Sequence, residues 1–453
     1  MSPSLAIALA DAGYRRALGD DVVLRWSTAD DVAGISDLYA QVFRQGPDDP
    51  PNALMGTWTR DMMSGRHPLI GPTDFAVVER TSDGTIVAAT CLLLEVWAYD
   101  GVDLPVGRPE VVATREEYRN RGFVRAIFEL IHARSLSLGR LAQGITGIEY
   151  YYRQFGYEYA LDLGGNRGLA LSAIPRLKEG GAEPFRLREA TLDDIPTLGA
   201  LYDRDRAYAL TSTRIDDVYW RWMLVGAHPD AAERWRIYVI TGGEERAVGY
   251  VIAARRAWRE GFTVGAIGVA EGVSLAGALP SVLRVLGEVA ATAPRRPDTE
   301  PPTTLIFTMG REHPVYEALG DLLPPAHRRP YPWYVRVPDL PAFLRRITSV
   351  LERRLASSVV AGYSGAVTLD FYRGGLRLVF ADGRLETAED WRRGAWDRPD
   401  GSFPPGVFLQ LLFGYRGLDE LRDIFPDVQA ADTVVPLLRA LFPSRPSWVV
   451  PLD

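Results

Sequence analysis

Residues 110–125 read Glu-Val-Val-Ala-Thr-Arg-Glu-Glu-Tyr-Arg-Asn-Arg-Gly-Phe-Val-Arg. The apolar run Val111–Thr114 is typical of the end of a strand, and a polar turn follows it. Beyond the turn, apolar residues recur at the spacing of an amphipathic helix: Phe123, Ala126, Ile127, Leu130, Ile131 and Leu138. The stretch therefore predicts a strand, a turn and a helix in direct succession.

The turn has the composition of an anion-binding corner. The first N–H groups of a helix lack partners within the helix, and the helix dipole adds partial positive charge there. Gly122 lets an anion approach the backbone because it has no Cβ, and Arg119, Arg121 and Arg125 add positive charge. On these residues alone, a pyrophosphate site and an ordinary strand–helix corner are equally good interpretations.

Two motifs carry a family resemblance. Arg119–Val124 resembles the acetyl-coenzyme A loop of the GNAT N-acetyltransferases, Gln/Arg-x-x-Gly-x-Gly/Ala, with Val124 as a departure at the last position. Downstream, Tyr152–Tyr157 reads Tyr-Arg-Gln-Phe-Gly-Tyr, which is similar to the Tyr-x-x-Phe-Gly-Tyr signature of the Eis-type (enhanced intracellular survival) GNAT enzymes. The resemblance implies acetyl-coenzyme A as co-substrate. The coenzyme-binding residues expected from it are Val112, Ala113, Thr114, Arg119, Asn120, Arg121, Gly122, Phe123, Val124, Arg125, Gly147 and Ile148.

Acetyl transfer to an amine needs a proton donor for the departing thiolate and a base for the amine. The family motif puts the donor three residues before Phe-Gly, at Tyr152; from the residues alone, any tyrosine of this stretch can instead be a core aromatic. Eis-type enzymes are thought to use the chain's own C-terminal carboxylate as base, which implies Asp453 here. Family tails usually end in an aromatic residue, so the α-carboxylate, the Asp453 side chain and a frayed, inactive end all remain open.

Composition limits the function classes. The 453 residues are 47% apolar and 24% charged, as in soluble globular proteins of two to four domains. A net charge of −7 argues against nucleic acid as the partner, and no apolar run suggests a membrane anchor. Cys91 is the only cysteine and the histidines have no metal-ligand spacing, so we expect no disulfide, no metal and a cytoplasmic location. Glu95 and Glu149 are candidates either to hold a cationic substrate or to face solvent.

An internal repeat divides the chain. Leu24-Arg25-x-x-Thr28-x-Asp30-Asp31 recurs as Leu187-Arg188-x-x-Thr191-x-Asp193-Asp194, and Tyr152-x-x-Phe155-Gly156 recurs as Tyr316-x-x-Leu319-Gly320. The counterpart of the coenzyme loop falls in Val264–Leu279, which lacks Arg-x-x-Gly and contains Glu271, a charge that repels phosphate. We therefore expect an α/β (α+β) protein with two GNAT folds: residues 1–178 with the coenzyme site and residues 179–338 as a degenerate copy.

Residues 339–453 form the third expected unit. A helix capped at Asp339, alternating strands near Val367–Phe371 and Leu376–Phe380, and short apolar helices resemble the sterol-carrier-like domain of Eis-type enzymes. The apolar tail is expected to dock on the protein. The first functional interpretation is an acetyl-CoA-dependent N-acetyltransferase for polyamine-like (aminoglycoside-like) small molecules or lysine, assembled as a hexamer by resemblance. The alternative is a non-catalytic lipid or small-molecule carrier that uses the sterol-carrier-like domain.

Overall fold

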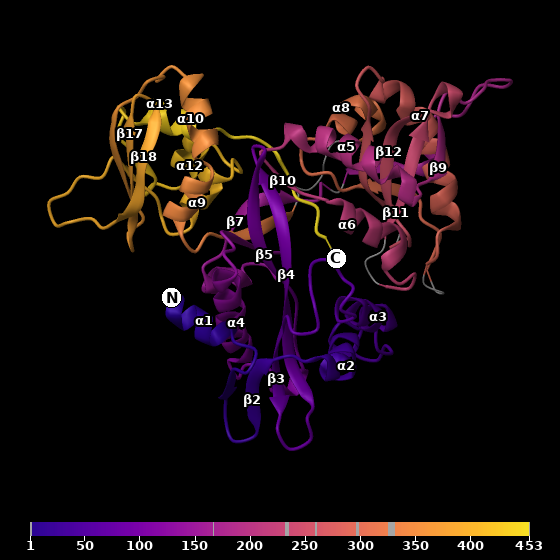
Figure 1. Ribbon diagram of the computed structural model, residues 1–453. Helices are drawn as coiled ribbons and strands as arrows, with labels where there is room; N and C mark the ends of the chain where they lie inside the picture. The colour runs from indigo at the N-terminus through magenta and orange to yellow at the C-terminus, as the bar shows by residue number, and fades with distance from the viewer. Residues whose placement is uncertain are drawn as a thin grey trace.

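The computed structural model describes residues 2–165, 167–231, 235–258, 261–295, 299–324 and 331–452. These residues form three units, each built on its own β-sheet with helices packed against it (Figure 1). The first unit lies at the bottom centre of the view, with the second and third units above it on either side. The expected mixed α/β fold, with tandem GNAT-like units and an additional domain, is confirmed.

Helices cover both faces of the first sheet. α1 (Pro3–Ala10) and α4 (Phe123–Ser137) pack on one face, and α2 (Val32–Val42) and α3 (Ala53–Met62) pack on the other (Figure 1). The strands of this sheet are β1 (Arg15–Ala17), β2 (Val22–Trp26), β3 (Phe75–Arg80), β4 (Ile86–Tyr99), β5 (Val102–Thr114), β6 (Ala142–Ile145), β7 (Glu158–Leu163), β10 (Thr211–Thr213), β15 (Tyr331–Arg336) and β21 (Ser447–Trp448). Their order is β1-β2-β3-β4-β5-β6-β15-β7, and β10 joins β4 to β21.

The repeated sequence motif builds the same corner twice. In the first unit the Arg25 guanidinium donates two hydrogen bonds of 2.7 Å to the Asp31 carboxylate, which caps the helix start at Thr28. In the second unit Arg188 makes the same bidentate contact with Asp194 at 2.8 and 2.7 Å. Such paired charge-assisted bonds fix the geometry of the strand-to-helix turn, which explains why both residues recur at the same spacing.

The second unit repeats the strand–turn–helix order of the first. Its sheet has the order β8-β14-β13-β12-β11-β9. The long helix α7 is apolar enough to cross a membrane by length and composition, but its buried side chains lie in the core of this unit. The strands are β8 (Arg167–Ala170), β9 (Arg186–Glu189), β11 (Trp235–Thr241), β12 (Ala247–Ala254), β13 (Gly261–Val269) and β14 (Thr304–Phe307), and the helices are α5 (Ile195–Asp205), α6 (Asp217–Arg221), α7 (Leu275–Thr292) and α8 (Pro314–Leu319).

The two repeats exchange their last strands. β8, which ends the first repeat, pairs with β14 in the second sheet. β15, which ends the second repeat, lies between β6 and β7 in the first sheet. The sequence divides the chain at residues 178 and 338, but in space the first sheet also contains β10 and β15 from residues 179–338 and β21 from the third unit, and the second sheet contains β8 from residues 1–178. The boundaries in the sequence therefore describe the repeat and do not describe the two sheets.

The third unit packs directly on the first. The Tyr99 hydroxyl at the end of β4 donates to the carbonyl of Leu412 at 2.6 Å, and Phe343 and Phe413 contact the same ring edge-on. The sequence predicted one helix after Asp339; the structure has two, with a break at Ile347. Its strands are β16 (Gly365–Asp370), β17 (Gly375–Ala381), β18 (Arg384–Trp391), β19 (Gly401–Ser402) and β20 (Gln429–Ala430), and its helices are α9 (Leu340–Arg346), α10 (Thr348–Ala356), α11 (Val407–Leu412), α12 (Leu418–Ile424) and α13 (Val435–Leu441).

The C-terminal tail docks between the units, as the sequence predicted. It leaves the third unit and runs across the top of the first sheet (Figure 1). β21 pairs in parallel with β10, the Thr213 hydroxyl donates to the carbonyl of Val450 at 2.8 Å, and the Leu452 side chain is buried. The tail thus carries the end of the third unit to the boundary between the first two units, where the Leu452 side chain packs in the core of the second unit and its carbonyl accepts from Arg108 of the first.

Candidate active site

The site begins at a fork between β5 and β6. The two strands pair in parallel only at Val106↔Ala142 and Gly107↔Gln143. Beyond these pairs they separate, so within the described residues the Arg108–Thr114 edge of β5 has no strand partner on that side. An open strand edge presents backbone N–H and C=O groups to an extended ligand. The fork can therefore hold a linear molecule along β5.

A bulge lies at the open part of β5. Ala113 pairs with Ala89 and Glu110 pairs with Cys91, so β5 contains one extra residue between these pairs. Val111 takes it up with φ of +53°, a left-handed conformation that is rare for a β-branched residue. Its side chain is nevertheless buried in the core on the α2–α3 side. Such bulges often occur beside active sites because they redirect backbone groups out of the regular ladder.

The turn after β5 has the conformation that the Arg-x-x-Gly motif predicts. Gly122 has φ of +80° and caps α4, and Asn120 also has a positive φ of 62°. α4 begins at Phe123, so the N–H groups of its first turn point out of the helix toward the turn. The helix terminus and the surrounding arginines together make this corner electropositive.

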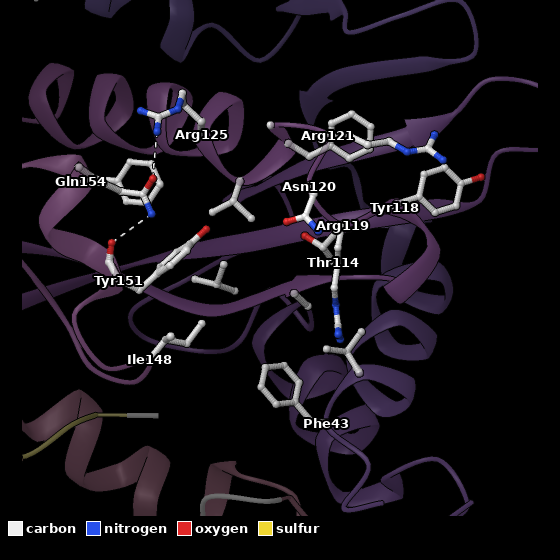
Figure 2. Close-up of a pocket in the computed structure, with 17 residues that line it drawn as sticks. Phe43, Thr114, Tyr118, Arg119, Asn120, Arg121, Arg125, Ile148, Tyr151 and Gln154 are labelled. Carbon is white, nitrogen blue, oxygen red and sulfur yellow. Dashed lines mark hydrogen bonds between the residues drawn. The ribbon is translucent and has the colours of Figure 1, made fainter. Parts of the chain in front are cut away.

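These elements line one pocket of about 470 Å³. Figure 2 shows β5 and the turn on one side of it and the segment around Tyr151 on the other. Arg125 donates a hydrogen bond of 2.9 Å to Gln154, which ties α4 to the Tyr151–Phe155 turn across the pocket. The pocket is lined by Val42, Phe43, Val112, Ala113, Thr114, Tyr118, Arg119, Asn120, Arg121, Gly122, Phe123, Val124, Arg125, Ile148, Tyr151, Gln154 and Phe155.

The structure brings the predicted coenzyme residues together, with one exception. Each of them lines the pocket except Gly147, whose carbonyl instead accepts a hydrogen bond of 2.6 Å from the Tyr331 hydroxyl. Val42 and Phe43, at the end of α2, also line the pocket, but no motif in their segment indicates it. Four other pocket residues lie within or beside the two motifs: Tyr118, Tyr151, Gln154 and Phe155. Their closeness to the motifs in the sequence could have predicted that they line the pocket.

Tyr152 packs behind the pocket wall. Its side chain is 3% exposed and belongs to an aromatic cluster with Phe128, Tyr157 and Tyr334. Burial raises the pKa of Tyr152, and the nearby Glu110 carboxylate raises it further. The phenol is therefore protonated at neutral pH, as a proton donor must be. The neighbouring Tyr151 lines the pocket itself, and its hydroxyl points into it (Figure 2).

A buried ion cluster lies on β4 and β5 next to the tail. Arg108 is 1% exposed and its Nε lies 2.7 Å from the fully buried carboxylate of Glu95. Arg108 also donates to Glu110 at 2.7 Å and to the carbonyl oxygen of Leu452 at 2.5 Å. Glu95 therefore neither faces solvent nor lies free for a substrate, whereas Glu149 is exposed. Sequence analysis missed Arg108 because its partner Leu452 is 344 residues away.

The predicted base, Asp453, lies outside the described residues. Leu452 directly precedes it, and the hydrogen bond from Arg108 places the Leu452 carbonyl at β5. Arg108 lies two residues before Glu110 on this strand. Within the described part of the chain, no group of three or more His, Cys, Asp or Glu side chains is arranged to hold a metal ion.

The equivalent corner of the second unit differs from the first. β13 and β14 form four residue pairs, between Gly261–Val264 and Thr304–Phe307. β5 and β6 form only two residue pairs before they separate. The turn from β13 into α7 contains no arginine, as the sequence predicted. Strand, turn and helix are thus retained with a shorter open edge, residues 265–269 of β13, and without the arginines.

Comparisons with known proteins agree with this geometry. Residues 24–160 match a family model described as an acetyltransferase (GNAT) domain. A comparison with curated proteins found no match. Among solved structures, the chain is similar to a probable N-acyltransferase from Enterococcus faecalis, with a TM-score of 0.66, 16% identity, and coverage of 96% of this chain and 100% of that one.

Two further solved structures have the same architecture. One is a GCN5-related N-acetyltransferase from Kribbella flavida, with a TM-score of 0.61, 18% identity, and coverage of 97% of this chain and 99% of that one. The other is Eis1 from Mycobacterium abscessus, with a TM-score of 0.57, 14% identity, and coverage of 93% and 98%. At these identities the likeness establishes the fold. The open fork, the helix corner and the family match together identify residues 24–160 as a GNAT acetyltransferase domain.

Proposed function

We propose that the protein is an acetyl-CoA-dependent N-acetyltransferase acting on primary amines of a polyamine-like, aminoglycoside-like small molecule or of a lysine side chain. The observation that carries the proposal is the junction between the β5–β6 fork and the arginine-rich pocket at the start of α4. The fork suits an extended amide-containing arm, and the helix terminus suits a pyrophosphate. A coenzyme A thioester contains both parts in one molecule.

The proposed reaction uses residues on both sides of the fork. The neutral amine attacks the thioester carbonyl carbon, so that a C–N bond forms and the C–S bond breaks. Backbone N–H groups of the Val112–Thr114 edge hold the carbonyl oxygen as negative charge develops on it. Tyr152 gives its proton to the leaving sulfur, and the carboxylate at Asp453 accepts the proton of the amine.

Two observations support a role for the chain terminus as base. The bond from Arg108 holds the Leu452 carbonyl on β5, on the strand that forms the fork. Glu110, on the same strand, is close enough to Tyr152 to raise its pKa. Arg108 thus contacts both the Leu452 carbonyl and Glu110, the carboxylate that acts on Tyr152. The α-carboxylate and the Asp453 side chain are both candidates for the base.

The charge around the tail supports a cationic acceptor. Two carboxylates, Glu95 and Glu110, surround the single guanidinium of Arg108. Carboxylates near the tail favour a cationic acceptor over an acidic one. Their charge is also one reason to prefer an amine over an alcohol as the substrate, since a neutral alcohol gains nothing from it.

A direct experiment tests the proposal. The protein is incubated with acetyl-CoA and a panel of polyamines, aminoglycosides and lysine peptides, and the released thiol is detected with a dye. We expect thiol release with at least one class and no release with alcohols. Thermal-shift titration separates the carrier alternative, because acetyl-CoA should stabilise an enzyme and a fatty acid or sterol should stabilise a carrier. We also propose a hexamer by resemblance, and sedimentation at micromolar concentration tests it.

A further inference from the structure

The segment Gly147–Tyr150 has unusual backbone geometry for a site-forming loop. Gly147 and Tyr150 have φ of 103° and 61°, both left-handed, and the segment belongs to neither a helix nor a strand. It connects β6 to the Tyr151–Phe155 turn, so it sets the positions of the pocket residue Tyr151 and the proposed donor Tyr152. A segment of this kind keeps its conformation only when its surroundings fix it.

Tyrosine hydroxyls from outside the segment hold its backbone. The Tyr331 hydroxyl donates to the carbonyl of Gly147 at 2.6 Å, and the Tyr334 hydroxyl donates to the carbonyl of Ile148 at 3.2 Å. The backbone N–H of Tyr150 donates to the Tyr159 hydroxyl at 2.9 Å. Three tyrosine hydroxyls thus bind the backbone of residues 147, 148 and 150.

The single proton on each hydroxyl fixes the direction of the remaining bond. Tyr334 and Tyr159 lie 2.5 Å apart at their hydroxyl oxygens, and their rings are 4.1 Å apart at the centroids. Because Tyr334 gives its proton to Ile148, Tyr159 must donate to Tyr334. The chain of bonds then runs from the Tyr150 N–H through Tyr159 and Tyr334 to the Ile148 carbonyl, and it leaves each of these hydroxyls with a donor and an acceptor role.

Both Tyr331 and Tyr334 come from the exchanged strand β15. The ring of Tyr334 also contacts that of Tyr152, with centroids 5.4 Å apart. We propose that Tyr331 and Tyr334 of the second repeat are positioning residues for the acyl-transfer site of the first repeat, because they fix the Gly147–Tyr152 segment. The degenerate copy therefore has a direct part in the site through its last strand. The catalytic part of this inference rests on the proposed function.

Single hydroxyl deletions test the inference. Tyr331→Phe and Tyr334→Phe keep the rings and remove the bonds to the segment. The matched control is Tyr372→Phe in the third unit, which removes a comparable phenol bond, of 3.0 Å, to the carbonyl of Asp427. Amide hydrogen exchange is measured for residues 147–152, together with kcat, the KM for the amine and the Kd for coenzyme A.

We expect faster exchange in this segment for both β15 variants and exchange at the wild-type rate for the control. A misplacement of about 1 Å can cost roughly 10²-fold in rate, so we expect kcat to fall about 10- to 100-fold. The Kd should change little, since most of the pocket comes from β5 and α4. Wild-type exchange rates in both β15 variants, or a wild-type kcat despite faster exchange, would overturn the inference.

The test separates this inference from the proposed function. Hydrogen exchange of the segment needs no substrate, so a wild-type protein that acetylates no amine counts against the proposed function alone. Tyr331 is half-buried, whereas Tyr334 is fully buried. If Tyr334→Phe fails to fold, Tyr331→Phe still gives both readouts, and its result decides.

Discussion

Gly122 gives the sharpest test of the coenzyme pocket. A Cβ built at this position meets no heavy atom within 4 Å, and the residue lines the pocket. The Cβ of a residue substituted at Gly122 therefore clashes with nothing in the unliganded protein. A leucine side chain there enters the space in front of the first turn of α4, where we place the pyrophosphate. A loss of affinity in Gly122→Leu would then be caused by the ligand's need for that space.

The size of the effect follows from two separate costs. The φ of +80° is left-handed, so leucine there should lower the free energy of unfolding by about 1–2 kcal/mol. That strain is present with and without ligand. Blocking one charge-assisted hydrogen bond between backbone and phosphate costs about 1.5–3 kcal/mol. This corresponds to a Kd roughly 10- to 150-fold higher.

The control lies at the other end of the same helix. Gly139 has φ of +67°, and a Cβ there also meets nothing within 4 Å, but it does not line the pocket. Gly139→Leu should lose similar stability and bind coenzyme A like the wild type. Calorimetric titration with coenzyme A measures the Kd, and thermal unfolding measures the strain. Equal Kd values for the two folded variants would refute the siting of the pyrophosphate at α4.

Other predictions concern the chemistry, the tail and the second copy. Tyr152→Phe should lower kcat by about 10²–10⁴-fold with little change in the Kd of coenzyme A; a larger kcat loss in Tyr151→Phe would move the donor to the pocket-lining phenol. Removal of Leu452 and Asp453 should lower kcat as strongly. Asp453→Ala removes the side chain and keeps the α-carboxylate, so full activity of this variant assigns the base to the terminus. Loss of activity in Asp453→Ala means that the side chain takes part. Full activity of the truncated enzyme excludes both groups. Arg108→Leu removes the guanidinium that pairs with the buried Glu95 carboxylate and should lower the free energy of unfolding by about 3–5 kcal/mol in denaturant titration. Calorimetry should give one coenzyme site per chain, and two sites would contradict the degenerate second copy.

The sequence could predict the pocket because its information is local. Strand β5, the turn and α4 are consecutive, so the periodicity of Phe123–Leu138 and the glycine at the turn define the corner without any distant contact. The Arg25–Asp31 and Arg188–Asp194 corners are similarly local, which is why the repeat could be read from spacing. Tyr151, which lines the pocket, was not among the predicted site residues; the assignment of the proton donor to Tyr152 stays a prediction.

Contacts between distant residues could not be predicted. Arg108 meets Leu452, and Tyr331 meets Gly147, across 344 and 184 residues, and no periodic pattern records such pairs. The strand exchange has a further reason. Because the two repeats have the same fold, β14 and β6 are equivalent strands, and β8 and β15 can each pair beside either of them. The repeated sequence therefore cannot tell which sheet receives which strand.

The exchanged strand β15 has a consequence for the order of folding during synthesis. β7 lies at the end of the first sheet and its strand partner there is β15. β7 ends at residue 163 and β15 begins at residue 331, so the ribosome adds the 167 residues 164–330 between them. At about 5–20 residues per second this interval lasts roughly 8–33 s. During that time β7 and the outer edge of β6 lack the strand that pairs with them, so the nascent chain should be most prone to aggregation and most dependent on chaperones before residue 336 has left the exit tunnel.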